Sequence, residues 1–557
     1  MIATHFAKFI SQRHLPGHER FIPLVRELCE AVDNGSSCLD LRASADLAEE
    51  EWGSIFACGG EGSAVASPGA SAPLILTPEG RLYLQRYYLH EQRIFEAVDA
   101  RANAAADAVG EAVLESVRKL FGTVEGNDQA AAALSALQRR FTIISGGPGT
   151  GKTTTVLKIL LLLKEQGHFD EATDCLLLAP TGKAADRLRQ SILEGLVRLD
   201  IGETGFPTET STIHRALGYR HDSIEFLHDA ANPLNARVVV IDETSMVDLP
   251  LMSRLMGALR PDARAILLGD KNQLTSVQVG TVLADLMEVA DSAAHPLKEC
   301  AVTLRKSYRT QGPIHTACEC IRAGDADKAW DEVTGSGPDV EGAIIHQLPP
   351  DNVRAAIGEF VARHWLPPLT GPNLTPREKL DAVDRFRILS PTHNGRFGVE
   401  AINRTVEQFL DAHGISVTGT WYPGRSVIVQ MNDYGLGIYN GDTGLALDSG
   451  DGGIDVCFSS PKGYRSIKPV RLPEVKSAWA LTIHRTQGSE YDHILLIIPP
   501  VGDSKILSRE LLYTGLSRAK LSATIWCEEE SFRATIATTV RRASGLPAMF
   551  SSLENDR

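Results

Sequence analysis

Short apolar runs recur from the middle of the chain to its end, separated by stretches with helical periodicity. The runs do not alternate apolar with polar positions, so both faces of each predicted strand are buried. This pattern is typical of parallel sheets with helices on either side, and the number of runs favours two sheets over one. The sequence therefore predicts an α/β chain. The predicted strands are Phe141–Ile144, Cys175–Ala179, Val238–Ile241, Ala265–Leu268, Phe386–Leu389, His493–Ile498 and Thr524–Cys527.

Three segments do not show this alternation of apolar runs and helical stretches. Helical periodicity over 21–32 precedes a connector rich in Gly, Ala, Ser and Pro at 61–71, which sets the first hundred residues apart. Residues 420–472 contain Gly, Val, Ile and Asn with turn signals, and we predict a small antiparallel β insertion there. Residues 218–235 are polar without a helical period, which fits a hairpin or an irregular loop.

The chain of 557 residues is too long for one hydrophobic core, so we expect three or four domains. The expected parts are an N-terminal, mainly helical domain, two parallel-sheet domains and the β insertion. Their predicted boundaries are 1–105 for the N-terminal domain, 106–300 for the first sheet domain with its hairpin insertion at about 218–235, 301–419 with 473–557 for the second sheet domain, and 420–472 for the β insertion.

Composition narrows the class of protein without identifying it. Apolar residues make up 43% and charged residues 23% of the chain, as in ordinary globular proteins. No apolar run is as long as a membrane span, and the first residues lack a signal-peptide pattern. Nine scattered cysteines favour reduced thiols in a cytosol. The formal net charge of −14 argues against a histone-like coating of nucleic acid, but not against a narrow basic channel.

A glycine-rich loop follows the first predicted strand and precedes a helix-like stretch. It fits the pattern G-x-x-x-x-G-K-[ST], in which backbone N–H groups surround a polyphosphate. In such loops the lysine, here Lys152, pairs with the β- and γ-phosphates, and the hydroxyl of the next residue, Thr153, holds Mg²⁺. The loop therefore predicts a site for ATP and Mg²⁺. Its predicted residues are Gly146, Gly147, Pro148, Gly149, Thr150, Gly151, Lys152, Thr153 and Thr154.

Two acidic residues end the predicted strand Val238–Ile241. We expect Asp242 to hold Mg²⁺ through water, and Glu243 to orient and deprotonate the water that attacks the γ-phosphate. The next strand is followed by Gln273, an uncharged side chain at the edge where open α/β sheets bind their ligands. Gln273 is a candidate to bond both the γ-phosphate and the attacking water.

Two arginines complete the predicted catalytic set. Arg309 ends the segment Ser307-Tyr308-Arg309, and Arg518 lies within the segment 513–520. The transition state of phosphoryl transfer spreads negative charge over oxygens, and an inserted guanidinium stabilises it. Each arginine taken alone is more typical of a surface residue, so their candidacy rests on the order of the segments.

That order resembles superfamily 1 helicases. Gln129 matches the adenine-reading motif ahead of the loop, and the acidic, glutamine and arginine segments match motifs II, III, IV and VI. Motif Ia, the segment after it, and motif V are also matched. The resemblance implies that these segments line the path of a DNA single strand, where hydroxyl, amide and imidazole groups bond phosphates with little sequence reading. The matching residues are Thr181, Gly182, Lys183, His214, Thr482, His484 and Gln487.

A closer resemblance, over essentially the whole chain, is to the RecD family, the α subunits of exodeoxyribonuclease V (the RecBCD complex). The segments that carry it are 37–41, 81–87, 388–391, 395–403, 424–433, 440–444 and 541–546. It implies a motor that uses ATP and Mg²⁺ to walk 5′→3′ along one DNA strand, unwinding duplex at double-strand breaks with RecB-like and RecC-like partners in the bacterial cytosol. It also implies two RecA-like domains that close on ATP, with Arg309 and Arg518 reaching across, and an SH3-like insertion.

Other functions stay open at this point. One is a stand-alone RecD-type helicase, although such proteins carry a longer N-terminal extension than this chain has room for. Others are a regulatory ATPase that does not itself unwind DNA, and a phosphotransferase built on the same loop. The basic, aromatic stretch Arg81–Tyr88 is expected to face a partner or to pack internally rather than to bind DNA. We find no acidic grouping typical of a nuclease, so any cleavage of DNA belongs to a partner.

Overall fold

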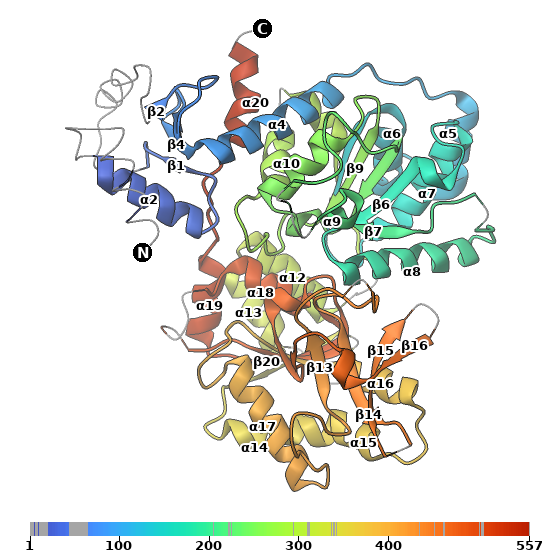
Figure 1. The fold of residues 1–557 in the computed structure, drawn as a ribbon, viewed down its shortest axis with the longest axis vertical. Coiled ribbons are helices and arrows are strands. Elements are labelled where there is room, and N and C mark those ends of the chain that lie inside the picture. Colours follow the sequence, from blue (N-terminus) through green and yellow to red (C-terminus); the bar gives the residue numbers. More distant parts are fainter. Residues whose placement is uncertain are drawn as a thin grey trace.

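The computed structural model shows two α/β lobes, one above the other, with a smaller N-terminal domain beside the upper lobe (Figure 1). The upper lobe contains the first parallel sheet, and the lower lobe contains the second sheet and the β insertion. The structure describes residues 5, 9, 21–43, 65–203, 205–220, 223, 225–292, 295–308, 312–335, 337, 340, 342–433, 435–450, 452–460, 463–500, 502 and 506–555.

Six parallel strands form the upper sheet, in the order β10-β5-β9-β8-β6-β7. All residues of β5, β8 and β9 are buried, as expected for strands that are covered on both faces. The elements of this lobe are α5 (Glu111–Phe121), α6 (Asp128–Gln138), β5 (Phe141–Gly146), α7 (Lys152–Glu165), β6 (Cys175–Ala179), α8 (Gly182–Arg198), β7 (Thr210–Thr212), α9 (Ile213–Ala216), β8 (Val238–Ile241), α10 (Leu249–Ala258), β9 (Arg264–Gly269), α11 (Val282–Asp291) and β10 (Ala301–Leu304).

Five parallel strands form the lower sheet, in the order β11-β20-β19-β12-β18. Each of the seven predicted runs lies within a strand of these two sheets or extends one residue beyond its end, which confirms the two-sheet α/β fold. The elements of the lower lobe are α12 (Pro313–Ala323), α13 (Ala326–Gly335), β11 (Ala343–Gln347), α14 (Val353–Phe360), α15 (Leu366–Thr370), α16 (Pro376–Asp384), β12 (Phe386–Ser390), α17 (Val399–Ala412), β18 (Ala480–Thr482), β19 (Tyr491–Ile497), α18 (Arg509–Leu516), β20 (Ala519–Trp526) and α19 (Glu529–Ala537).

The β insertion is an antiparallel sheet of five strands in the order β16-β15-β14-β13-β17. Its last strand lies beyond the predicted end at residue 472, because Val427 of β13 pairs with Ser477. The insertion therefore continues to Ser477. Its strands are β13 (Ser426–Val429), β14 (Thr443–Asp448), β15 (Ile454–Ser460), β16 (Gly463–Ile467) and β17 (Val475–Ser477).

The upper sheet domain extends beyond its predicted end at residue 300. Ala301 of β10 pairs with Ile143 of β5, so the upper lobe includes β10. This edge strand has one buried residue, Leu304, and carries no apolar run that the sequence could reveal.

The described residues of 218–235 contain turns but no strand, and a backbone hydrogen bond runs from Leu227 N–H to Gly218 O (3.3 Å). Of the two forms predicted for this segment, these residues take the irregular loop.

The N-terminal domain packs its helices and a four-stranded sheet against the upper lobe. The sheet has the order β1-β4-β3-β2, and α4 lies along α10. Tyr83 and Tyr87 of the basic, aromatic stretch are buried, so much of this stretch packs internally. The elements are α2 (Phe21–Asp33), β1 (Cys38–Asp40), β2 (Val65–Ala66), β3 (Leu74–Leu76), β4 (Arg81–Leu84) and α4 (Gln85–Ala102).

The C-terminal segment returns from the lower lobe to the upper one. Its helix α20 (Leu546–Asn555) lies against α4 and α11, with Leu546 and Phe550 buried in the same apolar core as those helices. Residues after 540 therefore leave the second sheet domain, to which the predicted range 473–557 assigned them. Apolar burial favours the return, because both side chains are removed from water against the upper lobe.

A buried carboxylate, that of Glu91 on α4, fixes the C-terminal segment. It accepts hydrogen bonds from the Tyr83 hydroxyl (2.9 Å), the Ser544 hydroxyl (3.0 Å) and the Gly545 N–H (3.2 Å). The Ser37 N–H also donates to the Ala543 carbonyl at 2.9 Å. Buried polar groups that are bonded in this way are costly to separate, so the N-terminal domain and the C-terminal segment form one unit.

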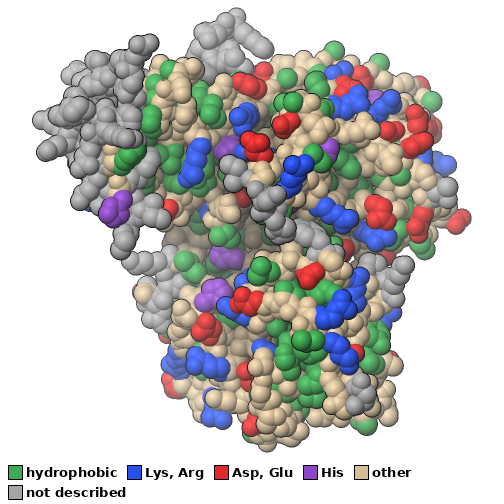
Figure 2. Space-filling view, in the orientation of Figure 1, with side chains coloured by type: hydrophobic (Ala, Val, Ile, Leu, Met, Phe, Trp, Pro, Cys, Tyr) green, Lys and Arg blue, Asp and Glu red, His purple; other side chains and the backbone are tan. Residues whose placement is uncertain are grey.

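The charged surface and the free cysteines are those that the amino-acid composition indicates. Figure 2 shows Lys and Arg interspersed with Asp and Glu over both lobes. The eight cysteines that the structure describes are all free thiols. Within the described ranges, no helix combines the length and the apolar character that crossing a membrane requires.

Replacing Asp285 by Asn should stabilise the upper lobe at high pH. Burial, and then the charge of Glu91, raises the pKa of Asp285 from 3.8 to about 7. Between these values the folded state binds a proton that the unfolded state releases, so this carboxyl costs stability as pH rises through the window, by about 1.4 kcal/mol per pKa unit. Asn keeps an acceptor for the Thr281 hydroxyl, which donates to Asp285 at 2.7 Å.

The expected result is a melting temperature close to that of the unchanged chain at pH 4, where the window begins, and a higher one at pH 8. Glu27→Gln, on an exposed position of α2, serves as the matched control and should show no such trend. A difference for Asp285→Asn that is the same at both pH values would contradict the assignment.

Candidate nucleotide site between the two lobes

The glycine-rich loop joins the end of β5 to the start of α7. Gly149 and Gly151 have φ values of +80° and +81°, which favour glycine. A Cβ atom on Gly151 would lie 2.6 Å from Nε2 of Gln129, so close approach also requires glycine there. The loop therefore points its backbone N–H groups and the positive end of the α7 dipole at one place, as an anion site requires.

Side chains around the loop hold it in shape. The Lys152 ammonium donates to the carbonyls of Gly146 (2.5 Å) and Gly147 (3.1 Å). Gln129 donates from Nε2 to the Thr150 carbonyl at 3.0 Å, which places the predicted adenine-reading residue directly on the loop. Thr153 lies in the first turn of α7 beside Lys152, whereas Thr154 is exposed.

The two acids at the end of β8 differ in environment. Burial, and then the charge of Glu243, raises the pKa of Asp242 to about 6, while Lys152 opposes the shift. Glu243 has a φ of +50°, a left-handed conformation that is strained for a residue with a side chain. The Glu243 N–H donates to the Asp242 carboxylate at 2.8 Å. The turn therefore places both carboxylates at the end of β8, with that of Asp242 in surroundings that disfavour its charge.

A cavity between the lobes gathers the predicted catalytic residues. Arg309 lies outside the described residues, but every other predicted catalytic residue lines this cavity. Gly146 and Gly147 lie on the opposite side of the loop, and Gln129 and Thr154 are not part of the lining. The lining residues are Pro148, Gly149, Thr150, Gly151, Lys152, Thr153, Arg187, Leu188, Ser191, Asp242, Glu243, Gln273, Glu490 and Arg518.

Gln273 is held at the contact of the two lobes and is 4% exposed. Its Nε2 donates to the Asp270 carboxylate (3.3 Å), which also accepts from the Tyr513 hydroxyl of the lower lobe (2.8 Å). Among the described residues no donor reaches the buried Oε1 of Gln273. A buried acceptor without a partner calls for water or ligand, which is the chemistry predicted for this residue.

The backbone of the next residue, Leu274, makes two more bonds across the interface. Its N–H donates to the Thr514 hydroxyl at 2.9 Å, and its carbonyl accepts from Nε2 of Gln487 at 2.7 Å. Gln487 is 8% exposed. The structure therefore places this predicted DNA-binding residue in an interdomain contact instead of on an open surface.

Arg518 reaches the cavity from the lower lobe and is nearly fully buried. Its guanidinium donates to the carbonyls of Thr514 (2.9 Å) and Ser489 (3.2 Å) and to the Ser517 hydroxyl (3.1 Å). Next to the predicted Arg309, the Tyr308 N–H donates to the Gly149 carbonyl at 2.9 Å. The described residues just before Arg309 therefore lie directly on the glycine-rich loop.

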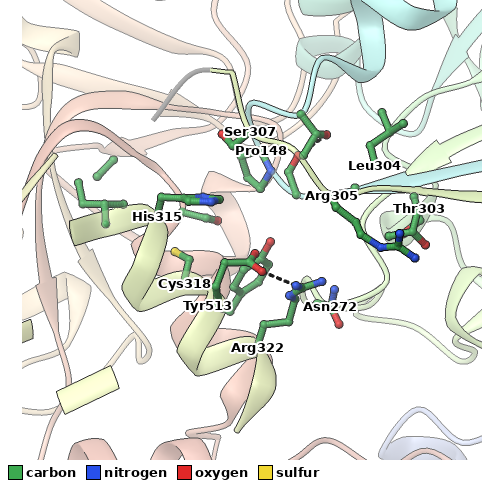
Figure 3. A pocket seen from close by; sticks show the side chains of 18 residues that line it. Pro148, Asn272, Thr303, Leu304, Arg305, Ser307, His315, Cys318, Arg322 and Tyr513 are labelled. Carbon is green, nitrogen blue, oxygen red and sulfur yellow. Dashed lines mark hydrogen bonds and ion pairs between the residues drawn. The ribbon is translucent and has the colours of Figure 1, made fainter. Parts of the chain in front are cut away.

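A second cavity lies behind the loop, and Figure 3 shows it. Pro148 and Ser307 border it on one side, and His315, Cys318 and Arg322 of α12 on the other. Tyr513 also lines it, and a Cβ on Gly147 would lie 2.9 Å from the Tyr513 hydroxyl. The loop is thus enclosed on both sides by parts of the lower lobe.

The residues predicted to line the DNA strand lie on both lobes. Thr181 caps α8 by accepting from the Ala184 N–H at 3.2 Å, and the ring of Tyr439, from the β insertion, packs against Gly182. Lys183 lines the cleft between α8 and the insertion. This side of the path is therefore covered by the insertion.

On the remaining part of the predicted strand path, burial is the main influence on the pKa values of the histidines. It lowers the pKa of both His214 and His484, which are half-buried. Thr482 is buried beside Arg485 in a groove that Arg425 and Lys476 also line. Neutral imidazoles and hydroxyls beside cationic side chains suit the phosphate backbone of a single strand.

Four residues at these contacts were not predicted from the sequence. Arg187 and Glu490 line the nucleotide cavity, Tyr513 joins the lobes, and Tyr439 covers Gly182. Tyr513 and Glu490 stand at the ends of segments that match motifs VI and V, which was the available signal. Nothing in the sequence distinguishes Arg187 from other helix arginines.

Two family models match parts of the chain, and solved structures resemble it weakly. An AAA domain model matches residues 129–279, and a UvrD-like helicase C-terminal domain model matches 477–525. Two crystal structures of Pif1 helicase, from Candida albicans and from Bacteroides bound to single-stranded DNA, each have a TM-score of 0.40. Their identities are 15% and 16%, and they cover 80% and 81% of this chain and 100% and 97% of their own.

Curated relatives match over most of the chain. The RecBCD enzyme subunit RecD of Mycolicibacterium smegmatis is 38% identical, covering 93% of this chain and 91% of the relative. RecD of Haemophilus influenzae is 31% identical over 85% of this chain and 81% of the relative. The ATP-dependent RecD2 DNA helicase of Deinococcus radiodurans is 29% identical over 82% of this chain and 56% of the relative. The chain therefore belongs to the RecD family of superfamily 1, and it is an ATP-dependent DNA helicase.

Proposed function

We propose that this chain is the 5′→3′ motor subunit of a RecBCD-type exodeoxyribonuclease V, which unwinds duplex DNA at double-strand breaks for recombinational repair. The observation that carries the proposal is the cavity between the lobes, where Lys152, Asp242 and Glu243 of one lobe face Arg518 of the other. A site built from two lobes ties their closure to the γ-phosphate, which is how hydrolysis drives movement.

In this mechanism each side chain acts on a different part of the phosphoryl transfer. Lys152 binds the β- and γ-phosphates, and Glu243 takes the proton of the attacking water. Gln273 orients that water through its unpartnered Oε1. Arg518, and with it Arg309, stabilises the charge that develops on the γ-phosphate oxygens.

We propose Mg²⁺ as the metal of this site, held by the Thr153 hydroxyl and, through water, by Asp242. The donor set fits, because Mg²⁺ prefers oxygen ligands and usually takes one or two carboxylates together with substrate phosphates. At Asp242, burial and the charge of Glu243 outweigh the positive charge of Lys152, so a bound cation would stabilise the ionised carboxylate. Held by these residues, Mg²⁺ would supply positive charge to offset that of the nucleotide phosphates.

The bonds between the lobes then transmit the state of the cavity to the strand path. Gln273 and Leu274 lie in the loop that follows β9, and the Leu274 carbonyl accepts a hydrogen bond from Gln487 in the segment that contains His484. Movement of Gln273 with the γ-phosphate therefore displaces one end of the proposed DNA path. Thr181, Lys183 and His214 form the other end.

RecB-like and RecC-like subunits are the proposed partners, because the curated RecD relatives are named as RecBCD subunits. The N-terminal domain is the proposed docking domain. We place the complex in the bacterial cytosol, where free thiols such as those of this chain persist. A stand-alone helicase and a regulatory ATPase are the competing functions.

The test is ATP hydrolysis by the purified chain with and without oligo-dT, followed by unwinding of duplexes with a 5′ or a 3′ single-stranded tail. We expect stimulation by DNA and unwinding from the 5′ tail only. Unwinding that appears only after RecB- and RecC-like partners are added also supports a subunit role. Unwinding from the 3′ tail alone would refute the polarity, and absence of unwinding with all partners present would favour a regulatory ATPase.

Lys152→Gln should abolish ATP turnover without unfolding the chain. The change removes the cation from the phosphates, and loss of one such contact costs about 10²–10³ in kcat. Steady-state hydrolysis and a melting curve measure the two effects. Lys164→Gln, at the other end of α7, is the matched control and should hydrolyse ATP normally. Turnover near that of the unchanged chain in Lys152→Gln would overturn the assignment of the site.

Glu243→Gln should retain ATP binding while hydrolysis falls by about 10²–10⁴, the usual contribution of a general base. Because the lobes then stay closed on uncleaved ATP, the variant should hold single-stranded DNA longer than the unchanged chain does. Nucleotide affinity is measured by fluorescence titration, and DNA retention by dissociation kinetics in the presence of ATP. A loss of nucleotide affinity would argue against its role as the base.

A further inference from the structure

An arginine outside the predicted catalytic set lies at the wall of the nucleotide cavity. Arg187 belongs to α8, the helix that begins at the predicted DNA-contacting residues Gly182 and Lys183. Its side chain is 35% exposed and lines the cavity together with Lys152 and Asp242. Since α8 extends from the strand path to the cavity, this one rigid element serves both.

The partner of Arg187 lies on the other lobe. Its guanidinium forms an ion pair with the carboxylate of Glu490, whose side chain is 8% exposed, and it donates to the Gly488 carbonyl at 3.2 Å. Gly488 and Glu490 follow Gln487 in the motif V segment, just before β19. The pair therefore connects the helix of motif Ia to motif V across the boundary between the lobes.

The pair also separates two spaces. The nucleotide cavity lies on one side, and on the other lies the larger cleft that Lys183 and Tyr491 line. Of the described residues, only Arg187 and Glu490 line both spaces. Any change in the distance between the lobes at the nucleotide must therefore act on this pair.

The segment that contains Glu490 is bonded to arginines of both lobes. Arg518 donates to the Ser489 carbonyl from the lower lobe, while Arg187 holds the residues on either side of Ser489 from the upper lobe. One arginine of the proposed catalytic set and one arginine outside it thus fix three consecutive residues. The nucleotide site and motif V cannot move independently while both sets of bonds are made.

We propose that Arg187 is a positioning residue that couples ATP hydrolysis to the DNA strand through its ion pair with Glu490. The pair forms when the lobes are closed and breaks when they separate, so motif Ia and motif V change their spacing once per ATP. The pair suits such a step because the Glu490 side chain is 8% exposed, so its carboxylate loses a nearby cation in a poorly solvated place when the pair separates. This inference rests on the proposed function.

The test compares Arg187→Gln, Glu490→Gln and the exchanged pair Arg187→Glu with Glu490→Arg. The readout is the stimulation factor, which is kcat for ATP with oligo-dT divided by kcat without it. We expect the factor to fall about tenfold in each single variant and to recover in the exchanged pair, as for residues that act through each other. Arg189→Gln on the same helix is the control, because Arg189 pairs with Glu209 of its own lobe.

A second readout does not depend on turnover. The affinity for oligo-dT is measured with and without a non-hydrolysable ATP analogue, and the single variants should lose the change in affinity that the analogue produces in the unchanged chain. Single variants that keep the factor and this change would overturn the proposal, as would failure of the exchanged pair to recover. If the unchanged chain itself shows no stimulation by DNA, the proposed function fails first.

Discussion

The hydrogen bond between the Tyr513 hydroxyl and the Asp270 carboxylate is the contact on which the arrangement of the lobes depends. Burial raises the pKa of Tyr513 well above its ordinary value, so the phenol keeps its proton and stays a donor. Both groups are buried, and a buried polar group without its partner is costly. The bond therefore fixes where the lower lobe meets the end of β9, and with it the positions of Gln273 and Leu274.

The strands that could be predicted are buried on both faces, whereas the features that were missed leave little local pattern in the sequence. Strands covered on both faces, such as β6 and β8, coincide with apolar runs and could be read directly from the sequence. β10 could not, because an edge strand with one buried residue carries no pattern that separates it from a loop. The return of the C-terminal segment to the upper lobe was equally invisible, since its two anchoring side chains, Leu546 and Phe550, pack against residues far away in the sequence.

In the candidate site, too, local sequence patterns were recognisable, whereas contacts between distant segments were not. The loop around Lys152 and the acids after β8 are local patterns, and the chemistry of phosphate binding makes them recognisable. The resemblance supplied Gln273 and Arg518, but not what they touch. Gln487 was expected to face DNA and instead bonds to Leu274, and the covering of Gly182 by Tyr439 depends on a fold contact that joins two lobes. Sequence motifs thus indicated which residues matter, while their partners required the tertiary structure.

The course of the chain has a mechanical consequence. The polypeptide passes between the lobes at two places, after β10 and again between Val540, which bonds to Glu510 below, and Arg542, which bonds to Ser276 above. Two connections restrict the relative movement of the lobes more than one connection does, because each of them must still reach from one lobe to the other after any displacement. The lobes can therefore open only as far as the shorter connection extends.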